Sequence, residues 1–198
     1  MKITEKDIKT IAESIGLSYA HLKALIVVET GGKGFDEKTN KILIQFEPHW
    51  FKKKTSYAPS GLWSVNKVDI QSKEWEAFNN AFNLGKGTDK EKECQTAALL
   101  ATSIGLPQIM GFNFALCGYK SVNEMWDSFK ISEYNQVAAM STFILNSSLQ
   151  QPLLSCNWDK VASIYNGKGY KELAIKLGRE PYDISLSKAF NKYRDSVI

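Results

Sequence analysis

Residues 24–50 read ALIVVETGGKGFDEKTNKILIQFEPHW, and this stretch places two glutamates where apolar runs end. The first run precedes Glu29 and is apolar on every side of a helix, which is typical of a buried helix. The second run, residues 42–46, alternates with a period of two and predicts a short strand that ends at Glu47. With a turn predicted over residues 36–41, the stretch indicates a buried helix followed by a small, early β-hairpin.

The rest of the chain is dominated by helical periodicity. No repeat, low-complexity tract or long linker interrupts it, so the sequence predicts one domain over residues 1–198. The predicted fold class is mainly α (α+β), a helical domain with one small β-hairpin near its start. Residues 55–68 are irregular and are predicted to form a surface loop beside a cleft. Helices are predicted from Thr4 to Gly16, from Ser18 to Thr30, from His49 to Lys53, and over residues 71–84, 90–104, 121–129, 132–149, 157–165 and 184–196.

The composition is that of an ordinary soluble domain, with 43% hydrophobic residues, 23% charged residues and a net charge of +4. Three widely spaced cysteines and only two histidines give no metal-binding pattern, so we expect reduced thiols, no metal and no cofactor. The N-terminal segment lacks an apolar signal core, and no segment is apolar enough for a membrane helix. The sequence therefore predicts a soluble protein without an export signal or stable membrane insertion.

Glu29 continues the helical spacing of Leu22 and Leu25 and is therefore predicted to lie on the inward face of its helix. Loss of solvation would raise the pKa of its carboxyl group, and the negative end of the helix dipole would act in the same direction. Both effects favour the neutral carboxylic acid, which is the form that a general acid requires. The alternative is a glutamate that frays into solvent at the end of the helix.

Glu47 is predicted to lie in the opposite environment, because it ends a strand and directly precedes Pro48 at the start of a short helix. Free backbone N–H groups at a helix N-terminus favour an anion, so we expect the pKa of Glu47 to be lowered. Simple electrostatics at a helix end would also account for a glutamate here. Two carboxyl groups with oppositely shifted pKa values are the pattern of a glycoside-cleaving pair, in which one is protonated and the other ionised.

Four sequence blocks resemble the N-acetylmuramidase domain of phage endolysins, within the lysozyme superfamily. VETGGKGF (residues 28–35) resembles a VESGG helix end, and FEPHWF (residues 46–51) resembles an FExHxF motif. GLPQIMG (residues 105–111) resembles a GLFQIMG segment, and YNGKGY (residues 165–170) resembles a YNGxGY segment. The blocks follow the family's order and span most of the chain. No separate cell-wall-binding module is therefore expected.

The resemblance implies a lysozyme-like fold, with Glu29 as the general acid and Glu47 as the second carboxylate. It also implies that four residues bind substrate, namely Gln108, Tyr165, Asn166 and His49. The sequence is also compatible with ordinary structural roles for these segments. The GLPQIMG block would suit a simple turn, Asn166 would suit a helix C-cap, and a lone histidine is often structural.

The chain departs from the family's pattern in three places. Thr30 stands where serine is frequent, which is a mild change. Pro107 stands where an aromatic residue is common, so this part of the cleft is expected to differ. Residues 171–181 are less similar. None of these departures touches the two glutamates.

The resemblance implies a peptidoglycan-degrading endolysin that hydrolyses the β-1,4 bond between N-acetylmuramic acid and N-acetylglucosamine. A lytic transglycosylase that uses Glu29 alone and a non-catalytic glycan-binding phage protein are the alternatives. The expected partners are the glycan strands of peptidoglycan. We expect a monomer that is made in the host cytoplasm and acts on the cell wall (periplasm) after release.

Two further expectations concern the basic residues. They are scattered without interleaved aromatic residues, which argues against a nucleic-acid partner. The basic C-terminal stretch, residues 185–198, is predicted to form a packed terminal helix. Its alternative is a basic amphipathic helix that helps the protein to cross an outer membrane.

Overall fold

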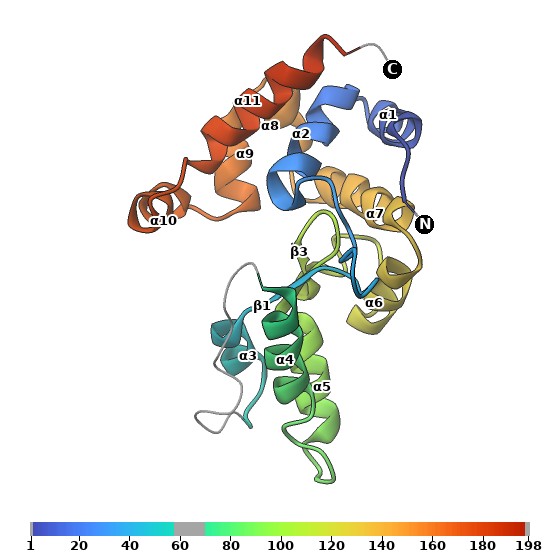
Figure 1. Ribbon diagram of the computed structural model, residues 1–198, viewed down its shortest axis with the longest axis vertical. Helices are drawn as coiled ribbons and strands as arrows, with labels where there is room; N and C mark the ends of the chain where they lie inside the picture. Colours follow the sequence, from blue (N-terminus) through green and yellow to red (C-terminus); the bar gives the residue numbers. More distant parts are fainter. Residues whose placement is uncertain (1, 58–69, 197–198) are drawn as a thin grey trace.

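The computed structural model describes residues 2–57 and 70–196, and helices dominate this part of the chain (Figure 1). The prediction of a mainly α fold with a little β structure is confirmed. The strands are β1 (Ile44–Phe46), β2 (Thr102–Ile104) and β3 (Ile109–Met110), and a 3₁₀ turn, η1, spans Gly111–Asn113. The helices are α1 (Glu5–Ser14), α2 (Tyr19–Thr30), α3 (Pro48–Lys54), α4 (Gln71–Phe82), α5 (Glu91–Leu100), α6 (Val122–Ile131), α7 (Glu133–Asn146), α8 (Gln150–Leu154), α9 (Trp158–Tyr165), α10 (Tyr170–Leu177) and α11 (Tyr182–Arg194).

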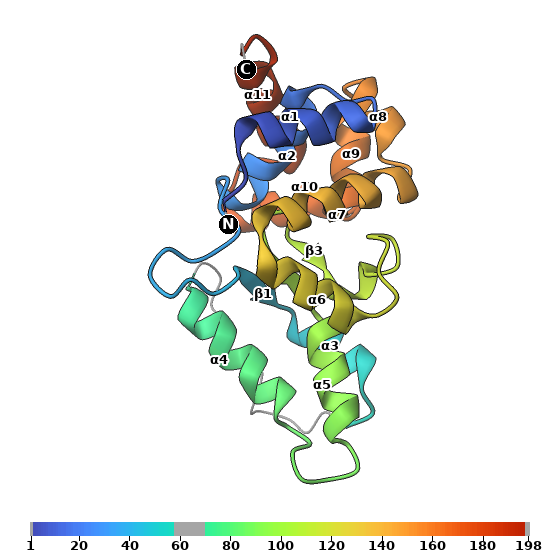
Figure 2. The ribbon, with the colours of Figure 1, turned by 90° about the vertical axis from the view of Figure 1, so that its right-hand side faces the viewer.

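The elements form two lobes that meet at the sheet (Figures 1 and 2). We call α1, α2 and α7–α11 the helical lobe, and the three strands with α3, α4 and α5 the sheet lobe. Helix α6 contacts both α5 and α7 and so joins the two lobes. Both ends of the described chain lie on the helical lobe, where α11 packs along α2.

Helix α2 is buried on most of its surface, as its apolar sequence predicts. Leu22, Leu25 and Ile26 are almost inaccessible to solvent. Gly31 ends the helix in the left-handed conformation (φ +63°), and its N–H donates to the carbonyl of Val27 at 2.9 Å. The carboxyl end of α2 consequently faces the sheet from within the helical lobe (Figure 1).

The sheet is antiparallel in the order β1-β2-β3, with Ile44 opposite Ile104. The predicted helix over residues 90–104 is too long, because α5 ends at Leu100 and the chain continues into β2. Pairing with β1 explains the difference, since residues 102–104 satisfy their backbone groups across the sheet and are fully or largely buried there. The early hairpin consists of one isolated bridge beside the turn over residues 36–41.

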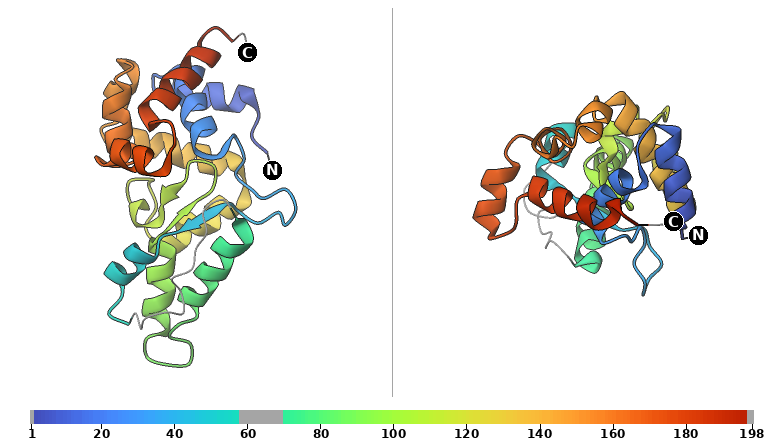
Figure 3. Two further views of the ribbon diagram at one scale, coloured as in Figure 1. Left: turned by 60° about the vertical axis from the view of Figure 1, so that its left-hand side comes forward. Right: turned by 90° about the horizontal axis from the view of Figure 1, so that it is seen from above.

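The free edge of β1 is covered by side chains of α4, which runs alongside the strand (Figure 3, left). An uncovered edge would present unpaired backbone groups to other chains. Here the side chains of α4 bond to the backbone groups that a further strand would otherwise occupy. These bonds fix the distance between α4 and β1. The bonds run from the Ile44 N–H to Gln71 Oε1 (3.0 Å), from Gln71 Nε2 to the Ile44 carbonyl (2.9 Å), from the Phe46 N–H to Glu74 Oε2 (2.9 Å) and from Trp75 Nε1 to the Ile42 carbonyl (3.2 Å).

Further helices differ from the sequence-based expectation. The predicted helix over residues 132–149 is too long, because α7 ends at Asn146 and Ser148 adopts the left-handed conformation (φ +60°). The short helix α8, which begins at Gln150, was not predicted. Helix α10 was not predicted at all, although its first residue, Tyr170, belongs to one of the sequence blocks described above. Most of the predicted surface loop, residues 58–68, lies outside the described residues.

The C-terminal helix α11 is packed against the protein, which confirms the first of the two expectations for this stretch. Leu186 is fully buried, and the ring of Phe190 lies 4.6 Å from the ring of His21 and 5.2 Å from that of Trp158. Across residues 2–57 and 70–196, no helix alone has the length and apolarity to cross a membrane. The bent pair of α1 and α2 meets that criterion only when the two are taken together.

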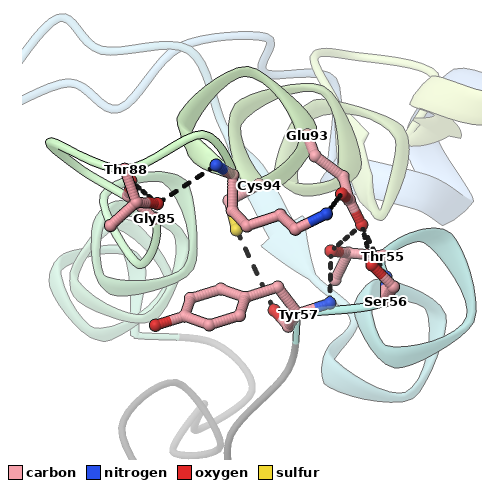
Figure 4. Close-up of polar contacts among 8 residues, drawn as sticks. Thr55, Ser56, Tyr57, Gly85, Thr88, Glu93 and Cys94 are labelled. Atoms are coloured by element: carbon pink, nitrogen blue, oxygen red, sulfur yellow. Dashed lines mark hydrogen bonds and ion pairs between the residues drawn. The ribbon is translucent and has the colours of Figure 1, made fainter.

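The segment that follows α3 is held to α5 by one carboxylate (Figure 4). Glu93 Oε1 accepts hydrogen bonds from the Ser56 N–H (2.6 Å), the Ser56 hydroxyl (2.8 Å) and the Thr55 hydroxyl (2.8 Å). These bonds lower the pKa of Glu93 to about 2, with the Ser56 side chain as the largest cause. Glu93 therefore anchors the end of α3, the helix that begins next to Glu47.

We expect Glu93→Gln to lower the melting temperature at pH 6 and to have less effect as the pH approaches 2. The folded-state pKa is depressed, so the ionised group contributes stability above its ordinary pKa of 4.5 and loses that contribution as the pH falls toward about 2. Thermal unfolding followed by circular dichroism at several pH values measures the difference. Glu172→Gln, at an exposed position on α10, is the matched control. A Glu93→Gln deficit that is the same at pH 6 and pH 2.5 would contradict the assignment.

Candidate active site

The last turn of α2 places Glu29 and Thr30 against the loop that joins β2 to β3. The Thr30 hydroxyl donates to the carbonyl of Leu106 at 3.1 Å, which fastens the helix end to this loop. Gln136 holds the loop from the other side, because its amide oxygen accepts the Leu106 N–H (2.8 Å) and its amide nitrogen donates to the Phe129 carbonyl (2.8 Å). The position of Glu29 thus depends on contacts between the two lobes.

Glu29 opens into a pocket of about 370 Å³ between α2, β1, α4 and the β2–β3 loop. We call it the Glu29 pocket. Of the residues predicted to form the site, it contains Glu29 and Gln108. Its lining residues are Glu29, Thr30, Leu43, Ile44, Gln45, Gln71, Glu74 and Gln108.

Burial raises the pKa of Glu29 to about 7, and a hydrogen bond from Tyr182 partly opposes this increase. The predicted direction of the pKa change is therefore confirmed. A carboxyl group with this pKa holds its proton through the weakly acidic range and can release it near neutrality. That is the property of a general acid.

Tyr182 is a residue of the site that the sequence did not indicate. Its hydroxyl donates to Glu29 Oε1, although the two residues are 153 positions apart. Tyr182 is the first residue of α11, and the packing of α11 on α2 brings it to the carboxyl group. No local motif marks such a contact, so only the tertiary structure reveals it.

Tyr165 lies beside this pair, as the resemblance implies. Its ring is nearly parallel to that of Tyr182, with an interplanar angle of 14° and centroids 6.3 Å apart. Its hydroxyl donates to the carbonyl of Pro107 at 2.6 Å. Burial, followed by the nearby Glu29, raises the pKa of Tyr165 well above its usual value, so its hydroxyl stays protonated and acts as a donor. Tyr165 and Tyr182 together form one wall beside the carboxyl group.

We expect Tyr182→Phe to shift the pH dependence of hydrolysis toward higher pH. The Tyr182 hydrogen bond lowers the pKa of Glu29, so its removal should raise that pKa further and keep the acid protonated at higher pH. The measurement is kcat/KM against pH from 5 to 9. Tyr134→Phe, at an exposed tyrosine on α7, is the control. An alkaline limb that stays in place or moves to lower pH would show that Tyr182 does not act on Glu29.

Gln108 lines the Glu29 pocket, but its amide group forms hydrogen bonds mainly to β2 and to the β2–β3 loop. Its Nε2 donates to the Gly105 carbonyl at 2.7 Å, and its Oε1 accepts the Ser103 hydroxyl at 3.0 Å. The residue adopts a left-handed conformation (φ +47°), which is uncommon for a side chain with a Cβ atom. Strained backbone of this kind is found most often at functional sites. Gln108 therefore shapes the pocket as well as lining it.

Glu47 lies at the junction of β1 and α3, as predicted, but the predicted direction of its pKa change is wrong. Burial raises the pKa of Glu47. The side chain makes no capping hydrogen bond to α3, and α3 is only seven residues long, so the helix end does not offset the loss of solvation. Glu47 does not line the Glu29 pocket.

His49 lies next to Glu47. When its imidazole is protonated, it carries the charge opposite to that of the Glu47 carboxylate. Its Nδ1 lies 3.4 Å from Glu47 Oε2, and its side chain is exposed. Burial by the surrounding protein, followed by the charge of Lys53, lowers the pKa of His49. His49 is consequently neutral at neutral pH and can donate to or accept from the Glu47 carboxyl group.

Asn166 is the C-cap of α9, and its N–H donates to the Ala162 carbonyl at 2.8 Å. The structure therefore supports the role of a C-cap. Its side chain is exposed and borders a separate depression of about 230 Å³ that also contacts Val28 and Tyr182. Asn166 thus does not line the Glu29 pocket.

Glu74 is a second carboxyl group in the Glu29 pocket that the sequence did not indicate. It is 1% exposed, and its Oε2 accepts the Phe46 N–H as described above. The bond to the strand edge makes Glu74 part of the frame that holds α4 to β1. Its burial argues against direct contact with a substrate.

The polar groups around Glu29 are carboxyl, hydroxyl and amide groups of the chain. They belong to Glu29, Thr30, Gln45, Gln71, Glu74 and Gln108 of the pocket and to Tyr165 and Tyr182 beside it. Within residues 2–57 and 70–196, no group of three histidine, cysteine, aspartate or glutamate side chains has the geometry to hold a metal ion.

Comparisons with known proteins identify the family and the fold of the chain. The model of the N-acetylmuramidase family matches residues 18–194. The crystal structure of the Burkholderia AP3 phage endolysin superposes with a TM-score of 0.75 at 29% sequence identity, covering 98% of this chain and 71% of that chain. A comparison with curated proteins gave no match.

The family match extends over nearly all of the described chain and includes all four sequence blocks. The mainly α fold with a small sheet agrees with that of the endolysin structure. The resemblance inferred from the sequence is thereby confirmed, and the chain is a glycoside hydrolase that acts on peptidoglycan. The protein belongs to the N-acetylmuramidase family.

Proposed function

We propose that the protein hydrolyses the β-1,4 bond between N-acetylmuramic acid and N-acetylglucosamine, with Glu29 as the general acid. The observation that supports this most directly is the partly buried Glu29 carboxyl group at the edge of a pocket, where loss of solvation raises its pKa to about 7. Such a group is protonated when the substrate binds and donates its proton to the leaving oxygen as the bond breaks. The Tyr182 hydroxyl positions the carboxyl group for this step.

Glu47 is proposed as the second carboxylate. In its ionised form it would attack the sugar carbon or activate a water molecule, depending on its distance from Glu29 in the bound complex. A separation of about 5 Å would favour retention of configuration, and about 6.5–9.5 Å would favour inversion. His49 is proposed to bind substrate beside Glu47, and Gln108, Tyr165 and Asn166 are proposed to contact it around Glu29.

A lytic transglycosylase is the second candidate, and one observation favours it. Glu29 lines its pocket together with Gln108 but without Glu47. In that mechanism a single glutamate acts first as acid and then as base, and the 6-hydroxyl group of the muramic acid attacks in place of water. The product is a 1,6-anhydro sugar that is lighter than the hydrolysis product by one water.

The product therefore tests the proposal. We expect purified peptidoglycan treated with the enzyme to yield reducing N-acetylmuramic acid ends when the fragments are examined by mass spectrometry. Anhydro ends would favour the transglycosylase. No cleavage by correctly folded protein would favour a non-catalytic glycan-binding protein.

We further propose that residues 1–198 act as one catalytic domain and as a monomer. The protein would serve as a phage endolysin that reaches the cell wall from the host cytoplasm after release. The family match and the similarity to an endolysin structure support this role. Sedimentation velocity of the purified protein would test the monomer.

A further inference from the structure

A second hollow borders the Glu29 pocket, and Gln71 lines both of them. It has a volume of about 730 Å³ and lies between α4 and the turn over residues 36–41. In Figure 2 this turn projects beside the N-terminal end of α4. We call this hollow the α4 groove. The shared residue means that a substrate cleaved next to Glu29 passes close to the groove.

The turn that forms one side of the α4 groove is rigidly built. Asp36 Oδ1 accepts the Thr39 N–H at 2.7 Å and the Lys38 N–H at 3.2 Å. The Asp36 N–H donates to the Lys41 carbonyl, and the Asn40 N–H donates to the Asp36 carbonyl, both at 2.8 Å. Asp36 therefore uses one carboxylate oxygen to close the turn. Lys38 and Lys41 extend from a backbone with little freedom to move.

The α4 groove contains two lysines, Lys38 and Lys41, together with the carboxylates of Asp36 and Glu76. Lys38 and Lys41 are both exposed, and neither forms an ion pair with any residue in the described ranges 2–57 and 70–196. Glu76, on the opposite side, is paired with Lys73 at 2.6 Å. The two lysines are consequently available for an anionic ligand.

Trp75 is an aromatic residue that lines the α4 groove, and its contacts bear on which kind of ligand the groove can bind. The Lys41 ammonium lies 5.2 Å from the centre of the Trp75 ring, within the range of a cation–π contact. The indole N–H is already bonded to the Ile42 carbonyl, so the ring is fixed in place. A sugar would need the open face of such a ring. Here an ammonium group covers a face, which favours a carboxylate ligand over a stacked sugar.

The substrate supplies such carboxylates next to the bond that is cleaved. N-acetylmuramic acid carries a short peptide, the stem, on the lactyl group at its third carbon, and this peptide has free carboxylate groups. The bond is cleaved at the first carbon of this same sugar. The sugar that carries the stem therefore lies next to Glu29 during cleavage. Asn79 and Asn80 line the groove farther along α4, and their amides can bond to a peptide backbone.

We propose that the α4 groove binds the anionic peptide stem of the muramic acid residue at the cleavage site, with Lys38 and Lys41 contacting its carboxylates. This inference rests on the function proposed above. It makes the enzyme selective for glycan strands that still carry their peptides. Charge-assisted hydrogen bonds from these two lysines would strengthen binding of such strands and leave the chemical step unchanged.

The test compares two substrates and two charge-matched variants. The substrates are peptidoglycan with its stems and the same glycan strands after an amidase has removed them. The variants are Lys38→Glu/Lys41→Glu and, as control, Lys86→Glu/Lys120→Glu, whose exposed lysines lie outside the groove. Thermal unfolding of each variant confirms that it is folded.

We expect Lys38→Glu/Lys41→Glu to lower kcat/KM on stem-bearing strands by about tenfold or more, mainly through KM. On stripped strands we expect less than about a twofold change, and the control should show the same small change on both substrates. An equal loss on both substrates would show that the groove binds the sugars themselves and would overturn the proposal. No loss on either would also overturn it. Failure of the wild type on both substrates would instead contradict the proposed function.

Discussion

Replacement of Glu29 by glutamine is expected to lower the rate of peptidoglycan hydrolysis by about 10²–10⁴-fold. Glutamine keeps the shape of the side chain and can still accept the Tyr182 hydroxyl bond, but it has no proton to give to the leaving oxygen. The wild-type rate should itself fall as the pH rises above about 7, because burial raises the pKa of Glu29 to about 7 and ionisation removes the acid. Release of reducing ends from purified peptidoglycan at pH 5–9 measures both effects.

The melting temperature of Glu29→Gln shows whether a loss of activity comes from the missing acid or from lost structure. The folded-state pKa is raised, so the folded wild type must carry a buried charge at high pH, whereas its carboxyl group is neutral at low pH. Glu29→Gln removes that cost and should melt at the same or a higher temperature than the wild type at pH 8, with a smaller difference at pH 4. An inactive variant that melts at a lower temperature at pH 8 would mean that lost structure, and not the lost acid, explains the result.

Replacement of Glu47 by glutamine is expected to have the second largest effect, a loss of about 10²–10⁴-fold in hydrolysis if the carboxylate attacks the sugar or activates water. The variant keeps the backbone bond from the Glu47 N–H to the Ala101 carbonyl (2.9 Å), so the junction of β1 and α3 should remain intact. The same reducing-end assay applies. Mass spectrometry of the products that the variant still forms shows whether they carry reducing ends, from hydrolysis, or anhydro ends, from transglycosylation.

A matched variant separates the role of Glu47 from a general effect of charge. Glu13→Gln, on the exposed side of α1, changes the net charge equally and should leave the rate unchanged. Full activity of Glu47→Gln, or anhydro products from the wild type, would assign the chemistry to Glu29 alone. That outcome would agree with the absence of Glu47 from the lining of the Glu29 pocket.

The sequence was most informative where local pattern and local structure coincide. The unbroken apolar run of α2, its terminal glycines and the helical spacing of Leu22 and Leu25 sufficed to predict that α2 is buried and that the pKa of Glu29 is raised. Burial of a helix follows from the composition of the helix itself, so no knowledge of its neighbours was needed.

Prediction failed where the outcome depends on distant residues. Residues 102–104 continue a helical pattern, and only their pairing with β1 shows that they form a strand. The pKa of Glu47 was predicted from the helix that follows it, whereas burial by other parts of the protein determines its direction. Packing of α11 brings Tyr182 to the Glu29 carboxyl group, and packing of α4 brings Glu74 into the Glu29 pocket. Neither contact could be predicted from the local sequence.

The bond between Tyr182 and Glu29 has a consequence for synthesis on the ribosome. The glutamate emerges early, and its tyrosine partner follows 153 residues later, on a helix that must then dock against α2. Until that happens, the Glu29 carboxyl group lacks the hydrogen bond from Tyr182 and the cover that α11 provides. A chain shortened before α11 would carry Glu29, Gln108 and Tyr165 but would lack Tyr182. The contact between Tyr182 and Glu29 can therefore form only after α11 has been synthesised.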